Sequence, residues 1–179
     1  MVSVIEFNHR LINEYIKEND ISIDMTIGNG NDTLVLVEKS KFVYGFDIQD
    51  EAINNTNKLL KGYTNYKLIK DSHLNFTNYI NEEVGVVVFN LGYLPKGNKG
   101  IHTKADIVLD TLKKVLGKLR KEGICNLVFY PGHPSGLEEA NLISDYLQTL
   151  NQKEFDVLKY EFINQINNPP FLISIKKRI

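Results

Sequence analysis

The chain has 179 residues, 42% of them hydrophobic and 24% charged, which is the composition of a globular domain and excludes disordered and fibrous proteins. A formal net charge of −1 argues against nucleic-acid binding by bulk electrostatics, and the single cysteine, Cys125, excludes an internal disulfide. The longest apolar run, residues 84–89, is too short to span a bilayer, and residues 1–20 lack the apolar stretch of a signal peptide. We therefore expect one cytoplasmic domain over residues 1–179, with no membrane partner.

Amphipathic stretches and short apolar runs alternate along the chain. The first half predicts a leading helix and then three strand–helix units, at residues 9–19, 21–26, 31–40, 41–48, 50–62, 66–70 and 75–81. The second half predicts a central strand, a long helix, a strand and a helix, at residues 84–90, 105–123, 124–130 and 136–150. Residues 155–177 predict two final strands, joined by a turn that contains Pro169 and Pro170.

The repeated strand–helix order predicts an α/β, Rossmann-like fold: a doubly wound, mostly parallel sheet with a C-terminal antiparallel hairpin. Ligands of such sheets bind outside the carboxyl ends of the strands, near the switch in strand order. This rule nominates the residues that follow Thr26, Ile48, Lys70, Asn90 and Tyr130.

The turn after the first strand, IGNGNDT, predicts a cofactor site. Gly28 and Gly30 allow the backbone to turn sharply and to approach a ligand. The polar side chains of the turn are Asn29, Asn31 and Asp32. Thr33 stands where a dinucleotide fingerprint has its third glycine, so the turn favours a cofactor without phosphate, such as S-adenosylmethionine (SAM), over NAD.

The next two strand ends carry further candidate cofactor ligands. Asp47 ends the second strand, where an acid can accept hydrogen bonds from both ribose hydroxyls, although it could instead cap the following helix. Gln49 follows at a position that could flank adenine. Ser72 and His73 follow the third strand, at the edge where adenine would lie.

The central strand ends in the string NLGYLP, which predicts the place of chemistry. Asn90 and Tyr93 have the spacing of the Asn and aromatic residue in the turns that many amine methyltransferases use, but the two prolines of those turns are absent. Asn90 could instead cap the strand. His133, in the string YPGHPSG, is expected on the same rim as a proton acceptor or a substrate contact, although a loop histidine is often incidental.

The charges are divided unevenly between the two halves of the chain. Residues 1–90 carry an acidic excess and residues 91–179 a basic one. Eight Lys and Arg residues fall within residues 96–121, which we interpret as a phosphate-facing patch with Lys96, Lys99 and Lys104 as substrate-binding residues. A solvated, lysine-rich helix face is the alternative. The spacing of His, Asp and Glu predicts no metal site.

Taken together, the strings DMTIGNGNDT, YGFDIQ, NLGYLPKGNKGIHT, FYPGHPSG and INQINNPPF resemble the small class I SAM-dependent methyltransferases of the rRNA methylase family. Members of this family are tRNA wobble-uridine methyltransferases of the MnmM type. The resemblance implies methyl transfer from SAM to the aminomethyl nitrogen of a modified thiouridine in the tRNA anticodon stem-loop. It also implies cofactor binding by Asn29, Asn31, Asp32, Asp47, Gln49, Ser72 and His73.

Other functions remain open from the sequence. The same cofactor site would serve a methyltransferase acting on rRNA or on a small-molecule amine. A catalytically silent RNA-binding domain and an NAD-dependent oxidoreductase are more distant alternatives. The oligomeric state is also open, with a homodimer as one expectation.

Overall fold

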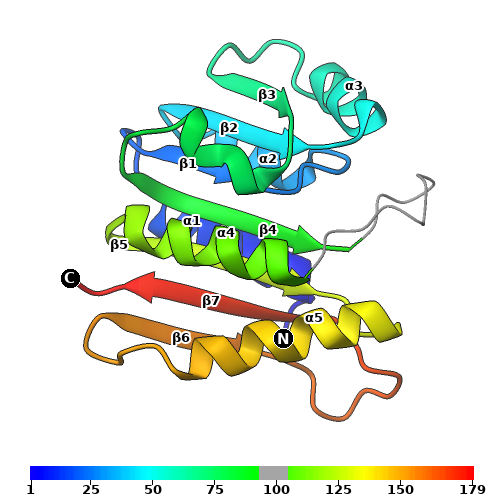
Figure 1. Ribbon diagram of the computed structural model, residues 1–179. Helices are drawn as coiled ribbons and strands as arrows, with labels where there is room; N and C mark the ends of the chain where they lie inside the picture. Colours follow the sequence, from blue (N-terminus) through cyan, green and yellow to red (C-terminus); the bar gives the residue numbers. More distant parts are fainter. Residues whose placement is uncertain (93–104) are drawn as a thin grey trace.

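The computed structural model describes residues 1–92 and 105–179. Its strands are β1 (Ile21–Asp24), β2 (Phe42–Asp47), β3 (Tyr66–Lys70), β4 (Val84–Leu91), β5 (Leu119–Phe129), β6 (Phe155–Tyr160) and β7 (Phe171–Lys177). They form one sheet in the order β3-β2-β1-β4-β5-β7-β6 (Figure 1). The first five strands of this order are parallel, and β7 is antiparallel to both β5 and β6. The predicted fold class is confirmed.

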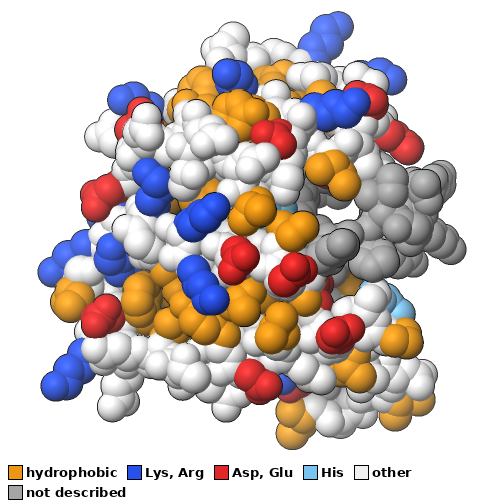
Figure 2. Space-filling view, viewed as in Figure 1, with side chains coloured by type: hydrophobic (Ala, Val, Ile, Leu, Met, Phe, Trp, Pro, Cys, Tyr) orange, Lys and Arg blue, Asp and Glu red, His pale blue; other side chains and the backbone are white. Residues whose placement is uncertain are grey.

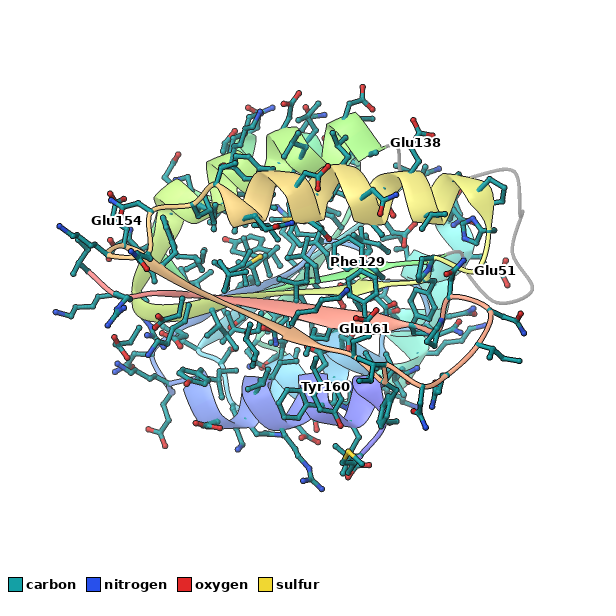
Figure 3. The ribbon with its side chains drawn as sticks, turned by 90° about the horizontal axis from the view of Figure 1, so that it is seen from below. Glu51, Phe129, Glu138, Glu154, Tyr160 and Glu161 are labelled. Atoms are coloured by element: carbon teal, nitrogen blue, oxygen red, sulfur yellow. The ribbon has the colours of Figure 1, made fainter. Side chains whose placement is uncertain are left out.

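Helices cover both faces of the sheet (Figures 1 and 3). They are α1 (Val4–Tyr15), α2 (Asn31–Val37), α3 (Asp50–Leu59), the 3-10 helix η1 (His73–Asn78), α4 (Ala105–Lys118) and α5 (Pro134–Gln148). Side chains of α1 and α2 pack on one face, and side chains of η1, α4 and α5 pack on the other. Within the described residues, no helix is both long and apolar enough to cross a membrane.

Strand β4 lies at the centre of the sheet, and this position explains why its sequence is a continuous apolar run. Val86 and Val88 point into the apolar cluster under α1, whereas Val87 and Phe89 point into the cluster under α4. All four are fully buried, so a continuous apolar run is what this position requires. Because β1, β2, β3, β4 and β5 run parallel, their carboxyl ends meet at one edge of the sheet.

The prediction of a helix over residues 105–123 is wrong at its C-terminal end. The helix ends at Lys118, and β5 already begins at Leu119. Helical periodicity continues through these residues, but tertiary contacts override it. The Arg120 guanidinium donates to both carboxylate oxygens of the buried Asp20, at 2.6 and 2.7 Å, which holds this segment against the amino edge of the sheet.

Candidate active site

A buried carboxylate holds the turn that follows β1. Asp24 accepts a hydrogen bond from the Thr33 hydroxyl at 2.6 Å and another from the Thr26 backbone N–H at 3.1 Å. Burial, and then the nearby Asp32, raise the pKa of Asp24 to about 7. The two hydrogen bonds tie the end of β1 to the first turn of α2, so the backbone between them is fixed in place.

Backbone conformation requires glycine at two positions of this turn, and close packing adds a second requirement at one of them. Gly28 and Gly30 have φ angles of 53° and 79°, in the left-handed region that side chains disfavour. At Gly30 there is also no room, because a Cβ would lie 2.6 Å from the Thr56 hydroxyl oxygen on α3. Glycine therefore lets the loop pass close to α3 and leaves backbone as the surface that a ligand would meet.

Asp47, at the end of β2, is bound to this same turn. One carboxylate oxygen accepts from the Gly28 backbone N–H and the other from the Gln49 backbone N–H, both at 3.0 Å. The side chain is half-buried. Each carboxylate oxygen has a second lone pair, so Asp47 retains acceptor capacity for the hydroxyls of a ligand. The predicted cofactor residues of the first two strand ends thus come together.

At the end of β3, Ser72 is partly exposed at the edge of the sheet, whereas His73 is buried. The Ser72 hydroxyl accepts from the Leu74 backbone N–H at 3.3 Å and caps η1. The His73 ring is buried, and its Nδ1 lies 2.8 Å from the Thr111 hydroxyl on α4. Burial lowers the pKa of His73 to about 4, so the ring is neutral at physiological pH. His73 lies at the predicted strand end, but its ring points into the core rather than toward the edge.

Asp32 connects three elements at the rim. Its Oδ2 accepts from the Asn90 amide at 3.3 Å, at the end of β4. Its Oδ1 lies 2.7 Å from His9 Nε2 and accepts from the Asn8 amide at 3.2 Å, both on α1. The Asn90 backbone N–H donates to the Thr26 hydroxyl at 2.7 Å, which fixes the strand end against the cofactor turn. The predicted cofactor turn and the predicted place of chemistry therefore adjoin through one carboxylate.

A buried polar chain runs behind this rim. The Asn8 side-chain oxygen accepts from the Asn126 amide at 2.9 Å, and the Asn126 oxygen accepts from the Ser174 hydroxyl at 2.7 Å. All three side chains are buried. Because each polar group has a partner, the chain stabilises one arrangement of α1 on the sheet.

Sequence reasoning missed the contribution of α1. Asn8 interrupts the apolar stripe that continues through Leu11 and Ile12, and a polar residue on the buried face of a helix signals a partner in the core. The spacing of the histidines predicts no metal site, so the sequence assigns His9 no role. Its proximity to Asp32 depends on how α1 packs against α2, which local sequence does not reveal.

Tyr130, directly after β5, is a further rim residue that the prediction left without a role. It is half-buried, and its ring would lie 3.2 Å from a Cβ at Gly92. Burial and then the negative charge of Asp32 raise its pKa, and the nearby Asn90 side chain acts in the opposite direction. Tyr130 therefore forms one wall beside Asn90.

His133 is engaged as the N-cap of α5. Its Nδ1 accepts from the Gly136 backbone N–H at 3.0 Å and lies 3.0 Å from the Ser135 hydroxyl. A ring nitrogen that accepts a backbone hydrogen bond carries no proton, so the proton of the neutral ring is on Nε2. Neither nitrogen then has a free lone pair. The expectation that His133 accepts a proton is therefore disfavoured by its capping role.

The predicted basic patch lies partly outside the described residues. Tyr93, Lys96, Lys99 and Lys104 lie outside the described residues. The other basic residues of 96–121 do not gather at the carboxyl edge. Lys114 and Lys118 donate to backbone carbonyls beside α4, and Arg120 is paired at the opposite edge. On the face of the molecule that α4 and α5 cover, Lys and Arg side chains are interspersed with Asp and Glu (Figure 2). The prediction of a single phosphate-facing patch over residues 96–121 is therefore wrong for the described part of this segment, residues 105–121.

Comparisons with known proteins agree with this architecture. The family described as "Putative rRNA methylase" matches residues 43–176. A curated Arabidopsis thaliana protein, the chloroplastic tRNA (mnm(5)s(2)U34)-methyltransferase, is 34% identical over 96% of this chain and 69% of its own length. The Ribosomal RNA small subunit methyltransferase H of Thermosipho africanus is 35% identical, but over only 42% of this chain and 28% of its own.

Two solved structures are similar over almost the whole chain. A protein of Clostridium thermocellum described as a "putative rRNA-methylase" is 40% identical, with a TM-score of 0.96 over 99% of this chain and 98% of the other. SMU.1697c of Streptococcus mutans, described as a "putative methyltransferase" and solved in complex with SAH, is 36% identical, with a TM-score of 0.93 over 99% of both chains.

Proposed function

Because this chain belongs to the "Putative rRNA methylase" family, we propose that it transfers a methyl group from SAM to the aminomethyl nitrogen of a modified thiouridine at the tRNA wobble position. The observation that carries the proposal is the 3.3 Å contact between Asp32 and Asn90. It joins the turn suited to a cofactor with the strand end suited to an acceptor amine.

The residues at the edge fit SAM. Gly28 and Gly30 leave the turn without side-chain bulk, and Asp47 retains acceptor capacity for a ribose. When bound, SAM supplies an activated methyl group on a sulfonium sulfur. Asn29 and Asn31 are exposed beside the turn, and Ser72 lies at the next strand end. The S. mutans relative, solved with SAH, supports this assignment.

Asn90 and its neighbours would position the acceptor. The Asn90 amide nitrogen is held by Asp32, which leaves its side-chain oxygen to receive an N–H of the amine. Tyr130 forms a wall beside Asn90, and we propose that Tyr93 stacks on the base. Holding the amine in line with the methyl group, away from water, provides most of the catalysis that such a transfer needs.

The name of the A. thaliana relative supports tRNA as the substrate. We assign Lys96, Lys99 and Lys104 to the anticodon-stem phosphates. Each phosphate contact releases counterions, so tRNA affinity is expected to fall steeply with salt. Replacing all three lysines with alanine should flatten this dependence. The matched control replaces Lys39, Lys41 and Lys61, which are exposed at the opposite end of the sheet, and should leave the salt slope unchanged.

The second candidate substrate is rRNA, which the shorter match to the T. africanus enzyme favours. The two substrates are separated by supplying purified tRNA and rRNA from cells that lack this protein, together with SAM carrying a labelled methyl group. The proposal predicts label in tRNA and none above background in rRNA. Label confined to rRNA would replace tRNA by rRNA as the substrate.

A further inference from the structure

The acceptor amine needs a base that the residues considered so far do not supply. An aliphatic ammonium has no lone pair, so its nitrogen must lose a proton before it can attack a methyl group. His133 is occupied as a helix cap. The Asn90 amide does not take up protons at neutral pH. A proton acceptor is therefore expected on some other group at the rim.

His9 has the geometry of such a group. Its Nε2 lies 2.7 Å from Asp32 Oδ1, and both oxygens of Asp32 already accept hydrogen bonds, from Asn8 and from Asn90, so Nε2 is the donor in this contact. The neutral ring then has its lone pair on Nδ1, which makes no hydrogen bond within residues 1–92 and 105–179. The His9 side chain is 28% exposed, whereas Asp32 is almost fully buried. Asp32 therefore fixes the Nε2 side of the ring, and part of the His9 side chain is exposed to solvent.

From this geometry we propose, on the basis of the proposed function, that His9 is the base that takes the proton from the substrate amine, with Asp32 as its positioning residue. Asp32 is shared between His9 and Asn90, the residue assigned to the amine, so base and acceptor site are connected through one side chain. A carboxylate in this position also stabilises the positive charge that the ring acquires.

The step balances in atoms and charge. One N–H bond of the substrate ammonium breaks, and its proton moves to His9 Nδ1, which leaves a lone pair on the amine nitrogen. That lone pair forms the new N–C bond as the C–S bond breaks, and the electron pair of the C–S bond stays on sulfur. The product is a secondary ammonium, and His9 later releases its proton to water.

Other titratable groups of this rim are less suited to the role. Asp24 is fully buried, and its two oxygens accept hydrogen bonds from the Thr26 backbone N–H and the Thr33 hydroxyl. The pKa of Tyr130, across the rim, is raised by burial. On α1 itself, Arg10 is paired with Glu6 at the surface. Asp32 is therefore the carboxylate that faces the ring.

The kinetic test compares single-turnover methylation by the wild type, His9→Ala and His9→Gln at saturating SAM, on tRNA that carries the aminomethyl group. Loss of a base of this kind is expected to slow the step about 100-fold or more at pH 7. The deficit should shrink as pH rises, because the amine then loses its proton to water, and added imidazole should restore part of the rate of His9→Ala. Arg10→Ala is the matched control on the same helix and should behave as wild type.

The second readout does not depend on turnover. Nitrogen-15 NMR of the wild-type protein should show the neutral His9 ring with its proton on Nε2, and Asp32→Asn should alter that signal. A neutral ring with its proton on Nδ1 would overturn the inference, as would a His9→Ala variant with the wild-type rate and pH profile. A wild-type protein that methylates no tRNA would instead contradict the proposed function and leave the tautomer measurement as a separate test.

Discussion

The carboxylate of Asp32, in the first turn of α2, lies 3.3 Å from the side-chain amide of Asn90 at the end of β4. The first residue belongs to the turn that would hold a cofactor, and the second belongs to the rim that would hold an acceptor. Within residues 1–92 and 105–179, Asn90 meets the turn through this contact and through its backbone N–H to Thr26, and a substitution of the side chain keeps the second, so it should separate binding from chemistry.

Asn90→Ala is expected to retain SAM affinity and to lose methyl transfer by about 100-fold, because we assign the lost group to the amine and not to the cofactor. Calorimetric titration with SAM measures the first quantity, and single-turnover methylation at saturating SAM measures the second. An unchanged rate would move the acceptor site away from the end of β4.

Asp47→Ala should have the opposite effect and weaken SAM binding. Loss of a charge-assisted hydrogen bond to the ribose is expected to cost about 1.5–3 kcal/mol, which is roughly a ten- to hundredfold loss of affinity. Asp50→Ala is the matched control, because Asp50 is exposed at the start of α3 and pairs with the exposed Lys70. Equal affinities for SAM in the two variants would remove Asp47 from the cofactor site.

Much of this edge of the sheet follows from the sequence, because parallel strands place their carboxyl ends together. Gly28, Asp47 and Gln49 are close for that reason, and their grouping was predicted from strand ends alone. The pairing of His9 with Asp32 was not predictable in the same way. It depends on the packing of α1 across the sheet, and no local pattern specifies that contact.

The end of α4 illustrates the same limit. Apolar spacing and lysines favour a longer helix, but one buried ion pair between Arg120 and Asp20 favours the strand. The two residues are far apart in sequence, so their attraction is invisible to periodicity. The same pairing removes Arg120 from the basic patch that the charge count had indicated.

Gly30→Ala should lower the free energy of unfolding by about 2–4 kcal/mol, since the new methyl group both strains the left-handed backbone and collides with Thr56. Gly62→Ala separates the two causes. Gly62 also has a positive φ, but a Cβ there would meet nothing within 4 Å, so its cost is expected to be about 1–2 kcal/mol. Urea denaturation measures both, and equal losses would contradict the packing of Gly30 against Thr56.

The buried carboxyl group of Glu139 should make the free energy of unfolding depend on pH. Burial in α5 raises its pKa from the ordinary 4.5 to about 8. The unfolded chain releases this proton near pH 4.5, whereas the folded protein retains it up to about pH 8. The contribution of the protonated Glu139 to the free energy of unfolding is therefore fully present below pH 4.5 and is lost as the pH rises toward 8. Glu139→Gln should therefore raise the free energy of unfolding by about 1–3 kcal/mol at alkaline pH and change little in acid. Glu138 is the exposed neighbour and provides the matched control. Thermal melts of Glu138→Gln across the same pH range should show no such trend.

The central claim is that the methyl acceptor is an aminomethyl nitrogen on tRNA. Its most direct test is to incubate the protein and SAM with tRNA carrying the aminomethyl thiouridine and with the same tRNA lacking that group, and then to measure the nucleosides by mass spectrometry. An unmodified uridine offers no nucleophilic amine at that position, so a mass gain of one methyl group is expected on the aminomethyl nucleoside alone. Efficient methylation of the tRNA that lacks the aminomethyl group would contradict the account.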